Sequence, residues 1–134
     1  MHNHIGRIVL LVDDYDAAQN FYKTNFGFET LYEMTTPEGQ RFLHIGTKDP
    51  HATGIWFIKA EGDAKERVGK QTAGEPVMVI YTTSIDKVYE KLQQNQVRIK
   101  TDPVIRSEFK FLHCFDLYGN EIIVVELNPD IIVE

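Results

Sequence analysis

Two side chains in this sequence place a charged or titratable group on an apolar strand, which suits them to ligand binding or proton transfer. Arg7 directly precedes the apolar run Ile8–Val12. A planar guanidinium can bind a carboxylate or phosphate through two hydrogen bonds, although an arginine at a strand end also commonly reaches into solvent or pairs with an acid. His113 lies between Phe111 and Phe115. Because imidazole titrates near neutral pH, His113 is the best candidate for a catalytic acid or base; the simpler interpretation is a hydrogen-bonded core histidine.

Two aromatic side chains are further candidates for contact with a ligand. Trp56 is the only tryptophan, and it suits either a stacking wall for a flat ligand or ordinary core packing. Tyr81 shares a strand face with Val77 and Val79 by alternation, which allows its hydroxyl to reach a pocket.

A metal site of two histidines and one carboxylate is a weaker hypothesis. It would take His44, His113 and either Glu121 or Glu126 from separate strands. No local spacing between these residues supports the site.

The elements that must position these side chains begin with a buried strand at Ile8–Val12. Asp14 can cap the helix predicted over 14–25, and Gly27 stands where a left-handed cap would end it. The apolar stripe of that helix includes Phe21, which we expect to be buried. Three short strands are predicted over 28–35, 41–46 and 55–59, followed by a polar connector over 60–75.

The same order of elements then repeats. A strand is predicted over 77–81, and Ser84 can cap a second helix whose apolar stripe runs to Leu92. The remaining strands are predicted over 97–99, 108–115 and 121–127. We therefore expect a single α+β domain over 1–134, with βαβββ modules at about 1–60 and 76–130. One helix covers only one face of a sheet, so two modules side by side would form a cup-shaped mixed sheet with a shared concave interior.

Composition limits the classes of partner. The chain has 134 residues, 43% of them apolar, and a formal net charge of −6, which disfavours nucleic acid and anionic membranes as partners. The single cysteine, Cys114, cannot form an internal disulfide, and alternation places it on the strand face opposite His113. The apolar runs are too short to cross a bilayer, so we expect a cytoplasmic protein.

Both ends of the chain resemble the signatures of one superfamily. Val12-Asp13-Asp14, Phe21-Tyr22 and Phe26-Gly27-Phe28-Glu29 resemble the opening signature of the vicinal-oxygen-chelate superfamily, which holds glyoxalase I, bleomycin-resistance proteins and extradiol dioxygenases. The closing signature is similar to Phe115-Asp116-Leu117-Tyr118-Gly119-Asn120-Glu121-Ile122, with Leu117 where the family has proline. The resemblance covers nearly the whole chain and implies paired βαβββ modules, a cup-shaped site and often a homodimer.

Enzymes of that superfamily hold a divalent metal ion on their strands. The resemblance assigns the four ligand positions to Arg7, Trp56, Val77 and Ile123. None of these side chains offers a lone pair to a cation. The resemblance therefore implies a divergent member without the usual ligands, and we expect no metal ion or other cofactor. The resemblance also turns Phe111 and His113 inward and therefore Cys114 toward the helix.

We interpret the chain as a metal-independent small-molecule binding protein of glyoxalase or bleomycin-resistance type, whose ligand has an apolar or aromatic body and an anionic group. The expected ligand-binding residues are Arg7, Trp56, Val77, Tyr81, Phe111, His113 and Ile123. Two alternatives stay open. One is an enzyme: a glyoxalase-like lyase or isomerase, or a dioxygenase, with relocated metal ligands, or a metal-free enzyme in which His113 transfers protons. The other is a structural dimer whose cup is filled by apolar side chains.

Overall fold

The structure is a computed structural model that describes residues 1–129, and the chain divides into two units, 1–69 and 70–134. The end of the predicted second module and of the predicted domain, residues 130–134, lies outside the described residues. The organisation of both modules as one domain stays a prediction.

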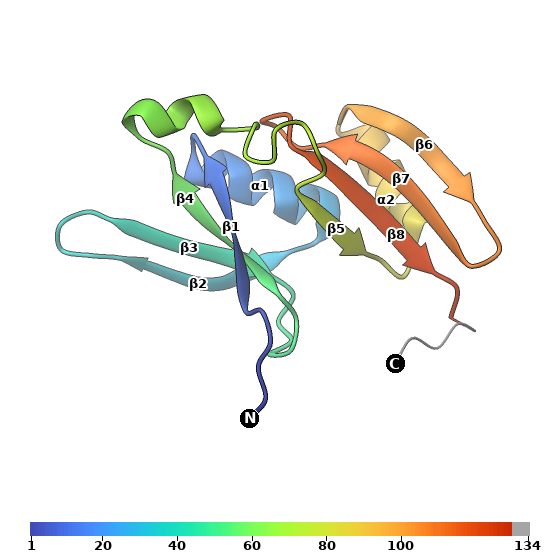
Figure 1. The fold of residues 1–134 in the computed structure, drawn as a ribbon, viewed down its shortest axis with the longest axis horizontal. Coiled ribbons are helices and arrows are strands. Elements are labelled where there is room, and N and C mark those ends of the chain that lie inside the picture. Colours follow the sequence, from blue (N-terminus) through green and yellow to red (C-terminus); the bar gives the residue numbers. More distant parts are fainter. Residues whose placement is uncertain (130–134) are drawn as a thin grey trace. The chain divides into compact units, whose positions relative to one another are not determined.

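The first unit is a four-stranded mixed sheet with one α-helix (Figure 1). Its strands lie in the order β1-β4-β3-β2, where β1 and β4 are parallel and the other neighbours antiparallel. The element bounds are β1 Arg7–Val12, α1 Tyr15–Phe26, β2 Glu29–Thr35, β3 Arg41–Gly46 and β4 Gly54–Lys59.

Asp14 begins α1 and Gly27 ends it, as the sequence predicts. Asp14 is extended, and its carboxylate accepts a hydrogen bond from the backbone N–H of Ala17 at 3.0 Å. This bond satisfies one of the donors that a helix start leaves unpaired. Gly27 ends the helix with φ of +71°, and its N–H donates to the carbonyl of Lys23.

The core of the first unit lies between α1 and one face of the sheet. Leu10 and Phe57 are fully buried on neighbouring strands, and the ring centroid of Tyr22 on α1 lies 5.8 Å from that of Phe57. Tyr22 is fully buried, whereas Phe21, which we expected in the core, is only half-buried. The helix turns Tyr22, one residue after Phe21, more directly onto the sheet.

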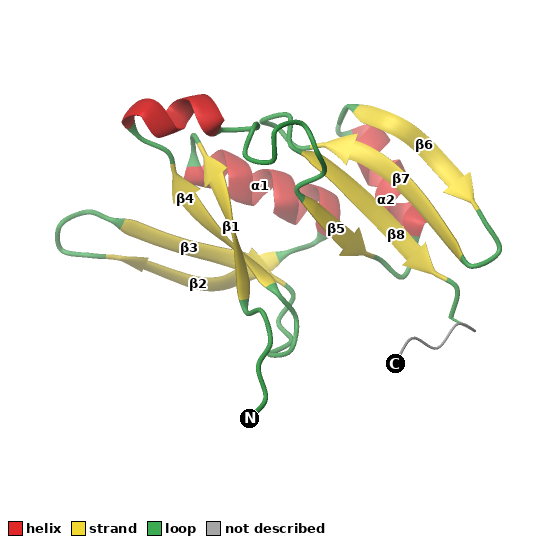
Figure 2. Ribbon diagram, in the orientation of Figure 1, coloured by secondary structure: helices red, strands yellow, loops and turns green. Residues whose placement is uncertain are grey.

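The second unit repeats the arrangement, with strand order β5-β8-β7-β6 and one helix (Figure 2). β5 and β8 are parallel, and the other pairs are antiparallel. Ser84 caps the helix by accepting a hydrogen bond from the N–H of Lys87 at 3.3 Å. The element bounds are β5 Met78–Tyr81, α2 Ile85–Gln94, β6 Ile99–Ile105, β7 Phe109–Phe115 and β8 Glu121–Leu127.

A buried carboxylate organises the turn between β7 and β8. Asp116 accepts hydrogen bonds from the backbone N–H groups of Tyr118 and Asn120, and from the Asn120 side chain, each at 2.9 Å. Gly119 has φ of +89°, which a side chain would disfavour. This network sets the register of β7 against β8, which carry the candidate site described below.

Two segments differ from the sequence prediction. β6 spans Ile99–Ile105 rather than 97–99, because the polar stretch that contains Pro103 lies on an edge strand, where a missing N–H is tolerated. The register of β6 against β7 shifts between Thr101 and Val104. The connector includes a 3-10 helix, Gly62–Arg67, which its polar, glycine-containing sequence did not indicate.

The predicted α+β class with two βαβββ modules is confirmed by these two mixed sheets. None of the helices within residues 1–129 is long and apolar enough to span a membrane.

Burial predicts which aromatic side chain of α1 matters most for stability. Tyr22→Ala should lower the free energy of unfolding by about 3–5 kcal/mol, as for other fully buried aromatic rings, and Phe21→Ala by clearly less. Urea denaturation checks this, with Tyr22→Phe as the control that keeps the ring. Equal losses for Tyr22→Ala and Phe21→Ala would contradict the packing described.

Candidate functional site

The face of the first sheet that points away from α1 carries the candidate site residues of the first unit. Alternation along the strands separates this face from the buried one. His44 pairs with Trp56 on β4 and with Tyr32 on β2, and Val9 pairs with Trp56 from the other side. We call this the first sheet face; its members are Arg7, Val9, Tyr32, Met34, Phe42, His44 and Trp56.

Arg7 and His44 contact each other on this face. The Nε–H of Arg7 donates to Nδ1 of His44 at 3.1 Å, and Nη1 donates to the carbonyl of Gly6 at 2.7 Å. Because a guanidinium only donates, Nδ1 of His44 must accept, and the neutral imidazole therefore carries its hydrogen on Nε2. Nε2 is buried and has no hydrogen-bond partner among the described residues.

Aromatic rings surround the imidazole of His44. Its centroid lies 5.4 Å from that of Tyr32 and 5.2 Å from that of Trp56, and Phe42 contacts Trp56 at 6.1 Å. Burial lowers the pKa of His44, and the positive charge of Arg7 lowers it further. Burial and Arg7 thus both favour the neutral imidazole, whose Nε2 donor is buried without a hydrogen-bond partner among the described residues.

A glycine on the neighbouring strand and an adjacent depression leave space around the Arg7 side chain. Gly54 lies beside Arg7 on β4, and a Cβ there would come within 3.1 Å of Arg7 Cδ and 2.8 Å of Leu31 Cδ1. Next to Arg7 lies a shallow depression of about 220 Å³ that is also lined by Lys48 and Asp49. Sequence reasoning missed Gly54, whose role depends on strand pairing.

The rest of the first sheet face is apolar and accessible. Val9, Tyr32 and Met34 are 40–45% exposed, and Trp56 is half-buried. Arg7 is exposed at the end of this row. The face can therefore contact an apolar or aromatic body while Arg7 contacts a negative charge.

The face of the second sheet that points away from α2 has a different polar centre. His113 on β7 lies opposite Ile123 on β8, which lies opposite Val79 on β5. Val77 flanks β5, and its N–H donates to the carbonyl of Glu121. We call this the second sheet face; its members are Val79, Tyr81, Phe109, Phe111, His113, Glu121, Ile123 and Val125.

Glu121 joins His113 to Lys100. Nδ1 of His113 lies 2.7 Å from one carboxylate oxygen, and Nζ of Lys100 lies 2.8 Å from the other. The Glu121 side chain is only 6% exposed. The hydrogen bonds from Lys100 and His113 hold the pKa of Glu121 below its usual value. Sequence reasoning missed Lys100, because the strand that it predicted ended at residue 99.

This pairing determines the tautomer of His113. An ionised carboxylate only accepts, so the neutral imidazole donates through Nδ1–H and keeps its lone pair on Nε2. The arrangement is the reverse of that at His44. The Nε2 atom of His44 carries the hydrogen and can donate it, whereas the Nε2 atom of His113 carries the lone pair and can accept a proton.

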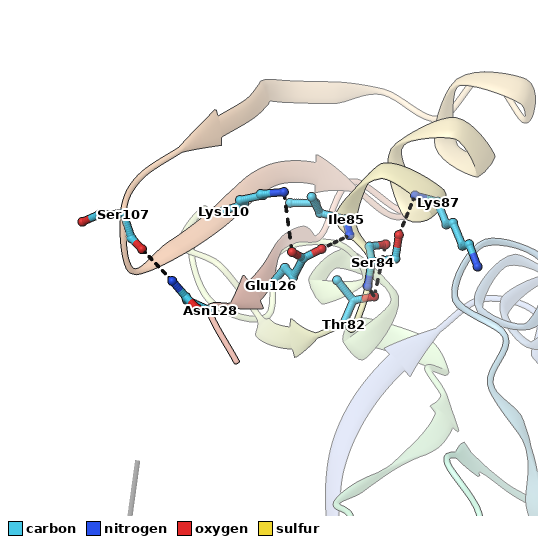
Figure 3. A network of polar contacts seen from close by, with 8 residues as sticks. All are labelled: Thr82, Ser84, Ile85, Lys87, Ser107, Lys110, Glu126 and Asn128. Atoms are coloured by element: carbon cyan, nitrogen blue, oxygen red, sulfur yellow. Dashed lines mark hydrogen bonds and ion pairs between the residues drawn. The ribbon is translucent and has the colours of Figure 1, made fainter. Parts of the chain in front are cut away.

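Glu126, the other carboxylate of the weaker metal hypothesis, is turned away from His113. Figure 3 shows its carboxylate at the start of α2, where it accepts from the N–H of Ile85 at 2.8 Å and lies 3.7 Å from Nζ of Lys110. Five positions separate it from Glu121, so the two lie on opposite sheet faces. Within residues 1–129, no three His, Cys, Asp or Glu side chains form a group that could hold a metal ion.

The four positions that the resemblance assigned to metal ligands do not fit a cation. Arg7 uses its hydrogen-bond donors on His44 and Gly6, and Trp56 packs against aromatic rings. Val77 and Ile123 have hydrocarbon side chains. These groups provide no lone pairs for coordination.

Two further expectations concern Tyr81 and Cys114. Tyr81 lies on the second sheet face but is 71% exposed, and the ligand contact predicted for it stays a prediction. Cys114 is fully buried on the helix side, as expected, and burial together with the nearby Asp116 raises its pKa to about 12. It is therefore a packing residue rather than a nucleophile.

Comparison with known proteins agrees with this architecture. The chain is 26% identical over 131 residues to an uncharacterized protein of Shewanella frigidimarina, covering 96% of each. The crystal structure of UcmS2 has a TM-score of 0.76 and 25% identity, covering 93% of this chain and 98% of that one. TnmS3, described as an antibiotic binding protein from Streptomyces sp. CB03234, has a TM-score of 0.75 and 20% identity, covering 95% and 98%.

The family model for the glyoxalase/bleomycin resistance protein/dioxygenase superfamily matches residues 4–124, which include both sheets almost completely. On this match and on the two βαβββ units, the chain belongs to the glyoxalase/bleomycin resistance protein/dioxygenase superfamily.

Proposed function

We propose that this protein binds a small molecule without a metal ion, and that the ligand has an apolar or aromatic body and an anionic group. The observation that carries the proposal is the Arg7–His44 pair on an exposed apolar sheet face. Among the structural relatives, TnmS3 is described as an antibiotic binding protein, which supports binding as a function that this fold can serve.

The anionic group follows from the donors of Arg7. Within residues 1–129 its hydrogen bonds go to neutral groups, the imidazole of His44 and the carbonyl of Gly6. The remaining N–H groups of the guanidinium can therefore bind a carboxylate or phosphate. A ligand oxygen that accepts from Nε2 of His44 would add to the affinity, because a buried donor without a partner costs about 1–3 kcal/mol.

The apolar body follows from the surroundings of this pair. Tyr32 and Met34 stay more than 40% exposed although they are large and apolar. A ligand ring stacked on Tyr32 or Trp56 would remove this surface from water. We also propose a homodimer and a cytoplasmic location.

Binding without a metal ion follows from the donor chemistry. A divalent cation next to Arg7 would be repelled by the guanidinium and would gain no ligand from Trp56. The positive charge that a metal ion supplies to family enzymes is here carried by Arg7 itself.

Small aromatic acids test this function. Benzoate should raise the melting temperature with the logarithm of its concentration above Kd, and uncharged benzyl alcohol should do so much less. Arg7→Met should weaken benzoate binding roughly 10- to 100-fold, the worth of a charge-assisted hydrogen bond of about 1.5–3 kcal/mol. Arg106→Met, which removes an exposed arginine of the second unit, is the matched control and should bind benzoate normally.

The same titration tests the independence from metal ions. After dialysis against a chelator, the benzoate-induced shift should be unchanged. A shift that disappears with chelation and returns with Zn²⁺ or Mn²⁺ would refute metal-free binding, and equal shifts for the wild type and Arg7→Met would refute the role of Arg7.

The pKa of His44 makes stability depend on pH. Because its folded-state pKa lies below 6.5, the unfolded chain takes up a proton first as the pH falls. The contribution of neutral His44 to the free energy of unfolding is therefore complete above about pH 6.5 and is lost as the pH falls toward the folded-state pKa.

Urea denaturation at pH 7.5, 6.5 and 5.5 checks this dependence. Between these pH values the free energy of unfolding should fall less for His44→Phe than for the wild type. His51→Gln, in an exposed loop, is the control; parallel curves for His44→Phe and the wild type would contradict the assignment.

A further inference from the structure

We propose that His113 and Glu121 form a proton-transfer site on the second sheet face, in which His113 is the general base for a small aromatic or apolar molecule with an activated C–H bond. Glu121 is the positioning residue. The inference goes beyond ligand binding at Arg7 and His44 and rests on a different unit of the chain, so each can fail without the other.

The geometry holds the imidazole in one orientation. Nδ1 of His113 is 2.7 Å from a Glu121 oxygen, and the other oxygen of this nearly buried carboxylate is 2.8 Å from Nζ of Lys100. The carboxylate is fixed from both sides, by β7 through His113 and by β6 through Lys100. A buried carboxylate that orients a histidine through Nδ1 leaves Nε2 free to accept a proton.

The surroundings leave Nε2 available in an apolar setting. The His113 side chain keeps 23% of its surface exposed, and no residue within 1–129 is seen to hydrogen-bond Nε2. Phe111 packs edge-on at 5.7 Å, and Ile123 lies directly opposite on β8. Beyond Ile123, Val79 is 52% exposed and can contact a bound molecule.

The chemical step is a simple proton transfer. The lone pair on Nε2 forms a bond to the proton, the C–H bond breaks, and its electron pair stays on the substrate. The resulting imidazolium keeps its Nδ1–H bonded to the negative Glu121, which stabilises the new positive charge. Lys100 keeps that carboxylate ionised. The imidazolium then returns the proton to another atom of the substrate, which completes an isomerisation, or to water.

A nitrobenzisoxazole is a probe suited to this site, because it is flat and apolar and reacts by loss of one C–H proton. Base removes that proton, a nitrile forms, and the N–O bond breaks to release a coloured cyanonitrophenolate. The wild-type protein should catalyse this elimination with saturation by the probe. His113→Gln and His113→Phe should each lower kcat at least about tenfold, while His51→Gln should not change it.

Glu121→Gln separates positioning from a merely structural role. Without the negative charge, the imidazolium that forms on proton uptake loses its stabilising partner, so kcat should fall. Glu121→Asp should restore part of the rate. Circular dichroism and melting curves identify which variants fold, and at least one of the two His113 variants must fold for the comparison.

Three outcomes would overturn the proposal. The first is elimination no faster than with the same concentration of free imidazole. The second is a folded His113 variant with the wild-type rate. The third is a folded Glu121→Gln variant with the wild-type kcat, or a folded Glu121→Asp variant no faster than Glu121→Gln. Loss of benzoate binding in Arg7→Met would leave this proposal unaffected, which keeps the two tests distinct.

Discussion

Each sheet of this protein is covered by one α-helix, so each sheet keeps one face without a helix of its own unit. The polar candidate residues lie on those uncovered faces. α1 and α2 each cover one face of their sheet (Figure 2). Side chains such as Leu10, Phe57 and Leu112 are fully buried. Because side chains alternate along a strand, every strand also presents a second set away from its helix. A one-residue slip would exchange the two sets and expose the core. The same register therefore determines the core and the positions of Arg7 and His113.

The two sheet faces use the same residue type for opposite purposes. His44 accepts from a cation, and His113 donates to an anion, so their Nε2 atoms have opposite hydrogen-bonding character. Each state follows from one residue on another strand of the same sheet. Arg7 supplies a donor that cannot accept, and Glu121 supplies an acceptor that cannot donate. A hydrogen-bond acceptor therefore suits Nε2 of His44, and a hydrogen-bond donor suits Nε2 of His113.

The family fold persists here although the positions of its usual metal ligands carry other chemistry. Apolar periodicity, the Asp14 and Ser84 caps and the turn around Asp116 act over a few residues, so the sequence was sufficient to predict both βαβββ units. The extension of β6 beyond Ile99 escaped prediction because Pro103 and its polar neighbours resemble a loop, and only pairing with β7 holds them as a strand. An edge strand is stabilised by its partner more than by its own composition.

By itself, the sequence determined the fold class, the order of the elements and the chemical character of the individual candidates, including the positive charge of Arg7 and the titratable ring of His113. Only the tertiary structure decided which groups meet: Arg7 with His44 across 37 positions, and His113 with Glu121 and Lys100. The physical reason is that a histidine's tautomer and basicity depend on its hydrogen-bond partners. Those partners lie on other strands of the same sheet, and strand register brings them together.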